Sequence, residues 1–210
     1  SVRRTKAVRQ IHQIDYYLEM VKALGCTPTE RSVQLHPGND DDGVANKLFN
    51  EQGIESGRTL IGLAPGAAYG PAKMWFPERF AAVVDRLIDD TGAQAILFGS
   101  GGDKESTAAV ARNARHCLID IAGKTNLKEA IVLISRCALF LSNDSGLMHV
   151  AGALGIPTVA IFGSTNPVTT SPVGEKSIVV HRDVPCSPCL KPVCPTDFRC
   201  MDLIGVEEVY

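Results

Sequence analysis

The sequence predicts an α/β fold, a doubly wound and mostly parallel Rossmann-like sheet. From Thr59 onward, short apolar runs alternate with segments whose apolar residues recur at spacings of three and four. Strands that alternate with helices in this way form right-handed βαβ crossovers, and helices then cover both faces of the sheet. With 210 residues and a hydrophobic content of 45%, the chain can bury a substantial core.

The first 58 residues precede this alternation. Apolar residues at helical spacing predict a helix from Val8 to Leu24, which Gly25 ends. The polar stretch 27–43 reads as a loop around one possible short strand at Ser32 to Leu35. A helix from Val44 to Gln52 follows. We interpret residues 1–58 as an interdomain linker helix with a polar connecting segment.

Residues 59–210 should form the Rossmann-like domain. The expected strands are Leu60 to Ala64, Gln94 to Phe98, Leu118 to Ile121, Leu139 to Asn143 and Thr158 to Phe162. The helices expected between and after them are Pro77 to Asp90, Lys104 to Arg115, Leu127 to Ser135 and Gly146 to Leu154. In such a sheet, ligands bind at the carboxyl ends of the strands, so the loops that follow the strands are the places to search for chemistry.

Composition excludes several classes of function. The 21 basic and 23 acidic residues give a net charge of -2, which provides no electrostatic surface for gripping nucleic acid. The longest apolar runs fall far short of the roughly 20 residues that cross a bilayer. Seven cysteines are an odd number, and several lie in helix-like or apolar stretches where reduced thiols are usual, which favours the cytoplasm. Because the sequence opens on Ser1, without Met, we expect a fragment of a longer protein.

The loop after the first strand, 65–75, could bind an anion. It contains two glycines, two prolines and Lys73, and it leads into the helix expected at Pro77. The spacing between Gly66 and Gly70 and the Met after Lys73 do not match the Walker pattern, so a P-loop nucleotidase is excluded. The alternative is that Lys73 is an ordinary solvated loop lysine.

The glycine cluster Gly99–Asp103 follows the second strand. It lacks the third glycine of the dinucleotide fingerprint at the required offset. A tight turn into a helix capped by Asp103 accounts for it.

The loop after the fourth strand is the most informative. There Ser145 and Gly146 begin a helix and should present backbone N–H groups to a pyrophosphate. His149 lies one helical turn later, and Asp144 can accept hydrogen bonds from two sugar hydroxyls. The alternative is that Asp144 or Ser145 only caps the helix and that His149 is a surface residue. Gly163 and Thr165 follow the fifth strand, next to this loop.

Three sets of residues together resemble glycosyltransferase family 9, the ADP-heptose:lipopolysaccharide heptosyltransferases. The first set is Lys73, Trp75, Pro77, Glu78, Arg79 and Phe80; the second is Asn143, Asp144, Ser145, Gly146, His149 and Ala151; the third is Phe162, Gly163, Thr165 and Pro167. The run His12 to Leu18 is also similar to the segment that joins the two halves of family members. The resemblance spans nearly the whole chain.

The resemblance implies the C-terminal, nucleotide-sugar-binding half of a two-domain enzyme of GT-B architecture. It implies inverting, metal-independent transfer of heptose from ADP-L-glycero-D-manno-heptose to the lipopolysaccharide inner core, with no cofactor required and with possible peripheral contact at the inner membrane. Lys73 would neutralise the donor phosphates, and Asp144, Ser145, Gly146, His149, Gly163 and Thr165 would bind the donor. The family's catalytic base is an aspartate of the N-terminal half, so this chain alone should be inactive.

Two rival functions remain open at this point. One is a transferase or epimerase of the same architecture that uses a UDP-sugar, and the other is a nucleotide-binding module that does no chemistry. Comparing the affinities for ADP and UDP distinguishes the first rival. An upstream α/β half that contributes an aspartate to this site would exclude the second.

Two further patterns suggest metals. The run Asp40–Asp42 is similar to the metal-binding motif of other transferases, but it lies in a polar loop, so a solvated charge run is the favoured reading. The tail loop 186–200 contains four cysteines, Cys186, Cys189, Cys194 and Cys200. They could hold a structural zinc, form two disulfides or remain free thiols, and free thiols are favoured.

Overall fold

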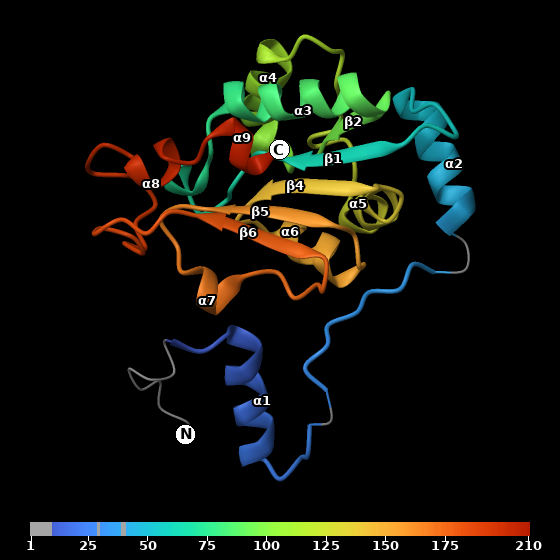
Figure 1. Ribbon diagram of the computed structural model, residues 1–210. Coiled ribbons are helices and arrows are strands. Elements are labelled where there is room, and N and C mark those ends of the chain that lie inside the picture. The colour runs from blue at the N-terminus through green and yellow to red at the C-terminus, as the bar shows by residue number, and fades with distance from the viewer. Residues whose placement is uncertain (1–9, 29, 39–40) are drawn as a thin grey trace.

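Six strands form one all-parallel sheet in the order β3-β2-β1-β4-β5-β6, shown in Figure 1. In this computed structural model, the described residues are 10–28, 30–38 and 41–210. The strands are β1 (Leu60–Ala64), β2 (Gln94–Leu97), β3 (Ile119–Asp120), β4 (Leu139–Asn143), β5 (Thr158–Phe162) and β6 (Ser177–His181). The strand order is that of the Rossmann fold, with its switch point between β1 and β4, so the predicted fold class is confirmed.

Helices follow the strands as the periodicity predicts. The α-helices are α1 (Gln13–Ala23), α2 (Asp41–Gln52), α3 (Pro77–Thr91), α4 (Lys104–Asn113), α5 (Leu127–Ile134), α6 (Gly146–Ala153), α7 (Pro167–Thr170), α8 (Arg199–Asp202) and α9 (Val206–Val209). Two short 3-10 helices, η2 (Pro71–Lys73) and η3 (Gly101–Asp103), lie in the loops after β1 and β2. The four helices predicted after Thr59 are confirmed to within two residues at each end.

Two predicted elements need correction, and one strand was missed. The short strand at Ser32 to Leu35 is wrong: these residues are exposed coil, and the N–H of Leu35 donates to the carbonyl of Ala153. The helix expected from Val8 begins only at Gln13, with His12 as its N-cap, and Val8 itself lies outside the described residues. The edge strand β6 was not predicted at all.

The two faces of the sheet bury alternate residues of each strand. In β1, Ile61 and Leu63 pack in one cluster with α3 and α4, whereas Leu60 and Ala64 pack in another with α2 and α5. Both faces are therefore dry, as expected for a parallel sheet. The division of the chain at residue 58 stays a prediction, although Leu48 of α2 belongs to the same cluster as Leu60.

The C-terminal tail folds back onto the carboxyl ends of the strands, at the left of Figure 1. Met201, Ile204 and Val209 are buried in the cluster that contains α3. The indole N–H of Trp75 donates to the carbonyl of Ile204 (3.1 Å), and the guanidinium of Arg79 donates to the same carbonyl (2.7 Å). The tail is therefore part of the core rather than an appendage.

Helix α1 contains no buried residue and lies beside α7 in Figure 1. Its N-cap, His12, is buried, and the ring Nε2 is 2.9 Å from the carbonyl oxygen of Ser171. This contact fixes the start of α1 to the end of α7. Among the described residues, no helix combines the length and the apolar character that crossing a membrane requires.

Candidate functional site

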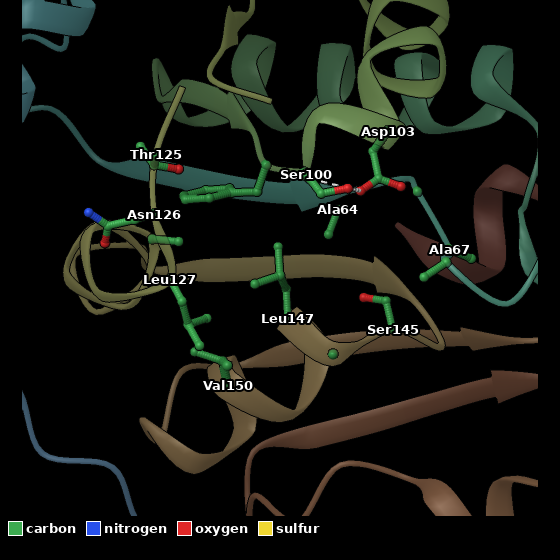
Figure 2. Close-up of a pocket in the computed structure, with 16 residues that line it drawn as sticks. Ala64, Ala67, Ser100, Asp103, Thr125, Asn126, Leu127, Ser145, Leu147 and Val150 are labelled. Atoms are coloured by element: carbon green, nitrogen blue, oxygen red, sulfur yellow. Dashed lines mark hydrogen bonds between the residues drawn. The ribbon is translucent and has the colours of Figure 1, made fainter. Parts of the chain in front are cut away.

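A cavity of about 470 Å³ opens at the switch point between β1 and β4. Figure 2 shows its lining: Leu147 and Val150 project from α6, Leu127 from the start of α5, and Ser100 and Asp103 from the loop after β2. The lining is mostly apolar, with a few polar groups at its edge. A cavity of this size and character suits a flat aromatic group such as a nucleotide base.

Gly66 is required where the loop after β1 passes the cavity. A Cβ at this position would lie 2.1 Å from Oδ1 of Asp103. Asp103 is itself fixed, because its Oδ2 accepts hydrogen bonds from the backbone N–H (2.8 Å) and the hydroxyl (2.7 Å) of Ser100. Asp103 is thus the third residue of η3 and closes a capping box with Ser100. The prediction that its side chain caps the following helix is wrong, because Asp103 is the N-cap residue of α4 but its side chain makes no cap hydrogen bond there.

Lys73 and Asp144 form an ion pair at the carboxyl ends of β1 and β4. Lys73 Nζ is 2.6 Å from Asp144 Oδ2, and the exposed fractions of the two side chains are 16% and 5%. The hydroxyl of Thr165 donates to the same oxygen, at 2.6 Å. The reading of Lys73 as a freely solvated lysine is therefore wrong, and three predicted site residues from three loops meet at one carboxylate.

The N-terminus of α6 points its first backbone N–H groups toward this region. Ser145 is the N-cap residue, but no side chain of the described residues caps the helix. The hydroxyl of Ser145 lies 3.0 Å from that of Ser142 instead. The alternative that Asp144 or Ser145 serves as a side-chain cap is thereby excluded, and the free N–H groups of Gly146 and the next residues can receive an anion.

His149 lies on α6, one helical turn after Ser145, and is not one of the residues that line the cavity. Its pKa is lowered, chiefly because the surrounding protein disfavours the charged ring, and the positive charges of His12 and Lys73 add to this, while Asp144 opposes it. By surface area His149 is exposed. The ring is therefore within reach of solvent, yet it is held neutral more firmly than a free imidazole.

The predicted residues divide into two groups. Ser145 and Gly146 line the cavity, whereas Lys73, Asp144 and Thr165 form the charged cluster next to it. Gly163 directly follows β5, and its predicted role in donor binding stays a prediction. A Cβ at this position would lie 2.6 Å from Cε of Met201, so a glycine is needed here for the tail to pack against the end of β5.

Asn143, the last residue of β4, is a functional candidate that the sequence reasoning quoted in a motif but assigned no role. Its side chain is fully buried and bonded at both ends: Oδ1 accepts from the N–H of Trp75 (3.0 Å), and Nδ2 donates to the carbonyl of Pro65 (2.6 Å). Nothing in the local sequence signals these two contacts, because their partners lie in a distant loop.

The four tail cysteines line a second cavity, of about 150 Å³, together with Ser164. All seven cysteines of the chain are free thiols in this structure, and the buried hydroxyl of Ser164 has no hydrogen-bond partner. Within the described ranges, no three His, Cys, Asp or Glu side chains are grouped closely enough to hold a metal ion. Free thiols at Cys186, Cys189, Cys194 and Cys200 are the favoured prediction, and elemental analysis of the purified protein tests the alternative of a structural zinc.

The prediction that the run Asp40–Asp42 lies in a polar loop needs correction, because α2 begins at Asp41 and not at Val44. The described part of this run belongs to no group of side chains that could hold a metal ion. Asp40 lies outside the described residues. Asp42 forms an exposed ion pair with Arg136, in keeping with a solvated charge run.

Comparison with known proteins finds relatives in a glycosyltransferase family. The family model of glycosyltransferase family 9 (heptosyltransferase) matches residues 2–198. Lipopolysaccharide heptosyltransferase 2 of Escherichia coli K12 is 39% identical over 144 residues, covering 67% of this chain and 41% of that protein. Lipooligosaccharide heptosyltransferase 2 of Campylobacter jejuni serotype O:6 is 32% identical over 169 residues, covering 78% and 53%. The chain thus spans roughly half the length of these curated relatives.

Two solved structures share the fold. E. coli ADP-heptose lipopolysaccharide heptosyltransferase II superposes with a TM-score of 0.73 at 31% identity, covering 87% of this chain and 53% of that one. The family 9 glycosyltransferase from Veillonella parvula DSM 2008 superposes with a TM-score of 0.80 at 26% identity, covering 100% and 60%.

Proposed function

Because the chain belongs to glycosyltransferase family 9, the heptosyltransferases, we propose that it forms the donor-binding half of a lipopolysaccharide heptosyltransferase. The donor is ADP-L-glycero-D-manno-heptose and the acceptor is the lipopolysaccharide inner core. The observation that carries the proposal is the buried Lys73–Asp144 pair beside the uncapped N-terminus of α6, at the edge of a mostly apolar cavity.

The arrangement supports one way of binding the donor. The adenine occupies the cavity lined by Leu127 and Leu147, and the diphosphate lies over the N–H groups of Ser145 and Gly146. Lys73 has three donors, so it can keep Asp144 while it contacts a phosphate oxygen. Thr165 acts by holding the Asp144 carboxylate.

The proposed reaction breaks the bond between the heptose and the diphosphate, so negative charge develops on the leaving ADP. A lysine and a helix N-terminus stabilise that charge without a metal ion. An acceptor hydroxyl attacks from the opposite face of the sugar, which inverts the anomeric centre. We assign the general base for that hydroxyl to the part of the relatives that this chain does not match.

We propose the cytoplasm as the location, with peripheral contact at the inner membrane where the lipid-linked acceptor is presented. The alternatives, a UDP-sugar enzyme of the same architecture and a module without chemistry, differ in their nucleotide preference and in heptose transfer, respectively.

Calorimetric titration of the 210-residue chain with ADP tests the proposal. ADP should bind, and Lys73→Ala and Asp144→Ala should each weaken binding by about tenfold or more, because each removes a charge from the pair. Lys47→Ala is the matched control, since Lys47 is exposed and pairs with Glu51 of its own helix. Absence of ADP binding, or tighter binding of UDP than of ADP, contradicts the proposal.

A further inference from the structure

The loop that carries Lys73 is closed by a single buried side chain. Asn143 bonds the carbonyl of Pro65 at the start of this loop and the N–H of Trp75 at its end. Both contacts come from one amide that is completely buried. The two ends of the loop are thereby tied to the last residue of β4.

Chemical complementarity makes asparagine the fitting residue here. The amide must donate to a carbonyl and accept from an N–H at the same time, and its oxygen and nitrogen do so at 3.0 Å and 2.6 Å. An ionised aspartate would set two oxygens against the Pro65 carbonyl. A leucine of similar volume would leave both backbone groups without a partner, which is costly in a buried site.

Asn143 is also next to Asp144, the partner of Lys73. Asn143 therefore holds both partners of the Lys73–Asp144 ion pair. It holds Lys73 through its hydrogen bonds to the ends of the loop, and it holds Asp144 through the peptide bond between them. Contacts from the tail support the middle of the loop: the N–H of Ala72 donates to the carbonyl of Pro192 (2.9 Å). Asn143 anchors the ends, so it fixes where the ammonium group of Lys73 stands relative to the N-terminus of α6.

We infer that Asn143 is a positioning residue of the donor site, which acts on the diphosphate of the donor only through Lys73. The inference rests on the proposed function. It assigns the asparagine of the motif to the geometry of the lysine loop and not to contact with the sugar or the phosphates.

A double-mutant cycle on ADP affinity tests this role. Asn143→Leu should weaken ADP binding about tenfold in the parent chain, but by less than about twofold when Lys73 is already alanine, because the lost positioning then has nothing to act on. A residue that touched ADP itself, or that only supported the fold, would reduce affinity by the same factor in both backgrounds. Asn113→Leu is the control, because Asn113 is exposed and its side chain donates to the carbonyl of Ala109 in its own helix.

The variant Asn143→Asp provides a second test, the pH dependence of ADP affinity, which does not depend on how well Asn143→Leu folds. A protonated carboxyl can donate to Pro65 and accept from Trp75 as the amide does, whereas the ionised form cannot donate. Burial and the adjacent Asp144 favour the protonated form, and Lys73 opposes it. ADP affinity relative to the parent should therefore be close to normal at about pH 5 and fall about tenfold by about pH 8.

The outcomes separate the two proposals. If the parent does not bind ADP, the proposed function fails and the role of Asn143 fails with it. If Lys73→Ala weakens binding but Asn143→Leu does not, or if the two effects multiply, the positioning role is overturned while the proposed function stands. The positioning role is also overturned if the ADP affinity of Asn143→Asp, relative to that of the parent, does not change with pH.

Discussion

At the scale of single residues, the site depends on a charge pair that is mostly withdrawn from water. Asp144 is 5% exposed, and its Oδ2 contacts the ammonium group of Lys73 and accepts a hydrogen bond from the Thr165 hydroxyl. Removing one partner of such a pair costs more than the pair contributes, because the remaining charge keeps its desolvation penalty. Stability and donor binding therefore depend on the same two side chains.

Replacing Lys73 with methionine should lower the free energy of unfolding by roughly 2 to 3 kcal/mol, since Asp144 is left with one neutral donor. Urea denaturation measures this. The double variant Lys73→Met/Asp144→Asn should recover part of the loss, because no unpaired charge remains. Lys47→Met, in an exposed pair, should change the value by less than about 0.5 kcal/mol, and an equal effect at both lysines would contradict the argument.

His149 gives the molecule a predictable response to acid. Its pKa in the folded protein is lowered from 6.5, first because the surrounding protein disfavours the charged ring, so the unfolded chain binds more protons in the window just below pH 6.5. Stability from this group is complete above the unfolded pKa and is lost as the pH falls toward the folded value. His149→Gln should flatten that part of the profile. NMR titration of the ring should give a pKa below 6.5, and a higher value would refute the assignment.

At the scale of elements, the pattern of apolar residues predicts a helix or strand best where that element is buried. The strands β1, β4 and β5 are predicted to the residue, because each is a short, mostly apolar and largely buried segment that a helix follows. The edge strand β6 escaped prediction because it follows a proline- and glycine-containing stretch and only Val180 is buried. The false strand at Ser32 to Leu35 has suitable residues but no neighbouring strand to pair with.

The site was predictable to the level of loops but not of contacts. Parallel topology brings the loops of Lys73 and Asp144 to one edge of the sheet, so their proximity follows from the sequence pattern. The hydrogen bond from Thr165 and the two from Asn143 join residues that are far apart in the chain, and only tertiary packing determines them.

The cysteines of the chain should differ in reactivity, because their surroundings shift the pKa of the thiols in opposite directions. The Thr196 side chain and backbone hydrogen-bond the sulfur of Cys194 and lower its pKa, whereas burial raises the pKa of Cys137, below β4, to about 12. In iodoacetamide labelling followed by mass spectrometry, Cys194 should react first and Cys137 last. Thr196→Val should slow Cys194 toward the rate of the exposed Cys117. Rapid labelling of Cys137 in the native state would contradict the burial argument.

At the scale of the whole molecule, the two ends of the described chain contribute very differently. The tail supplies Met201, Ile204 and Val209 to the core, whereas α1 supplies no buried residue. The tail also bonds the segment that follows the lysine loop, through Trp75 and Arg79. Trp75 and Arg79, two residues of the family motif, therefore hold the tail against the rest of the domain.

A matched pair of truncations to alanine measures this asymmetry. Ile204→Ala should cost about 2 to 5 kcal/mol of unfolding free energy, because Ile204 is fully buried and leaves a cavity. Ile14→Ala, in α1, should cost less than about 1 kcal/mol. Thermal or urea denaturation provides the comparison, and similar costs for the two variants would mean that the tail is not part of the cooperative core.

The position of the tail also has a consequence for synthesis. A chain emerges from the ribosome with its N-terminal part first, and domains begin to fold as they appear. Here the sheet can be complete through β6 while the cluster over α3 still lacks Met201, Ile204 and Val209. Until translation has passed Val209, the nascent chain exposes an apolar face beside Trp75, and in that interval it depends on chaperones or on speed to avoid aggregation.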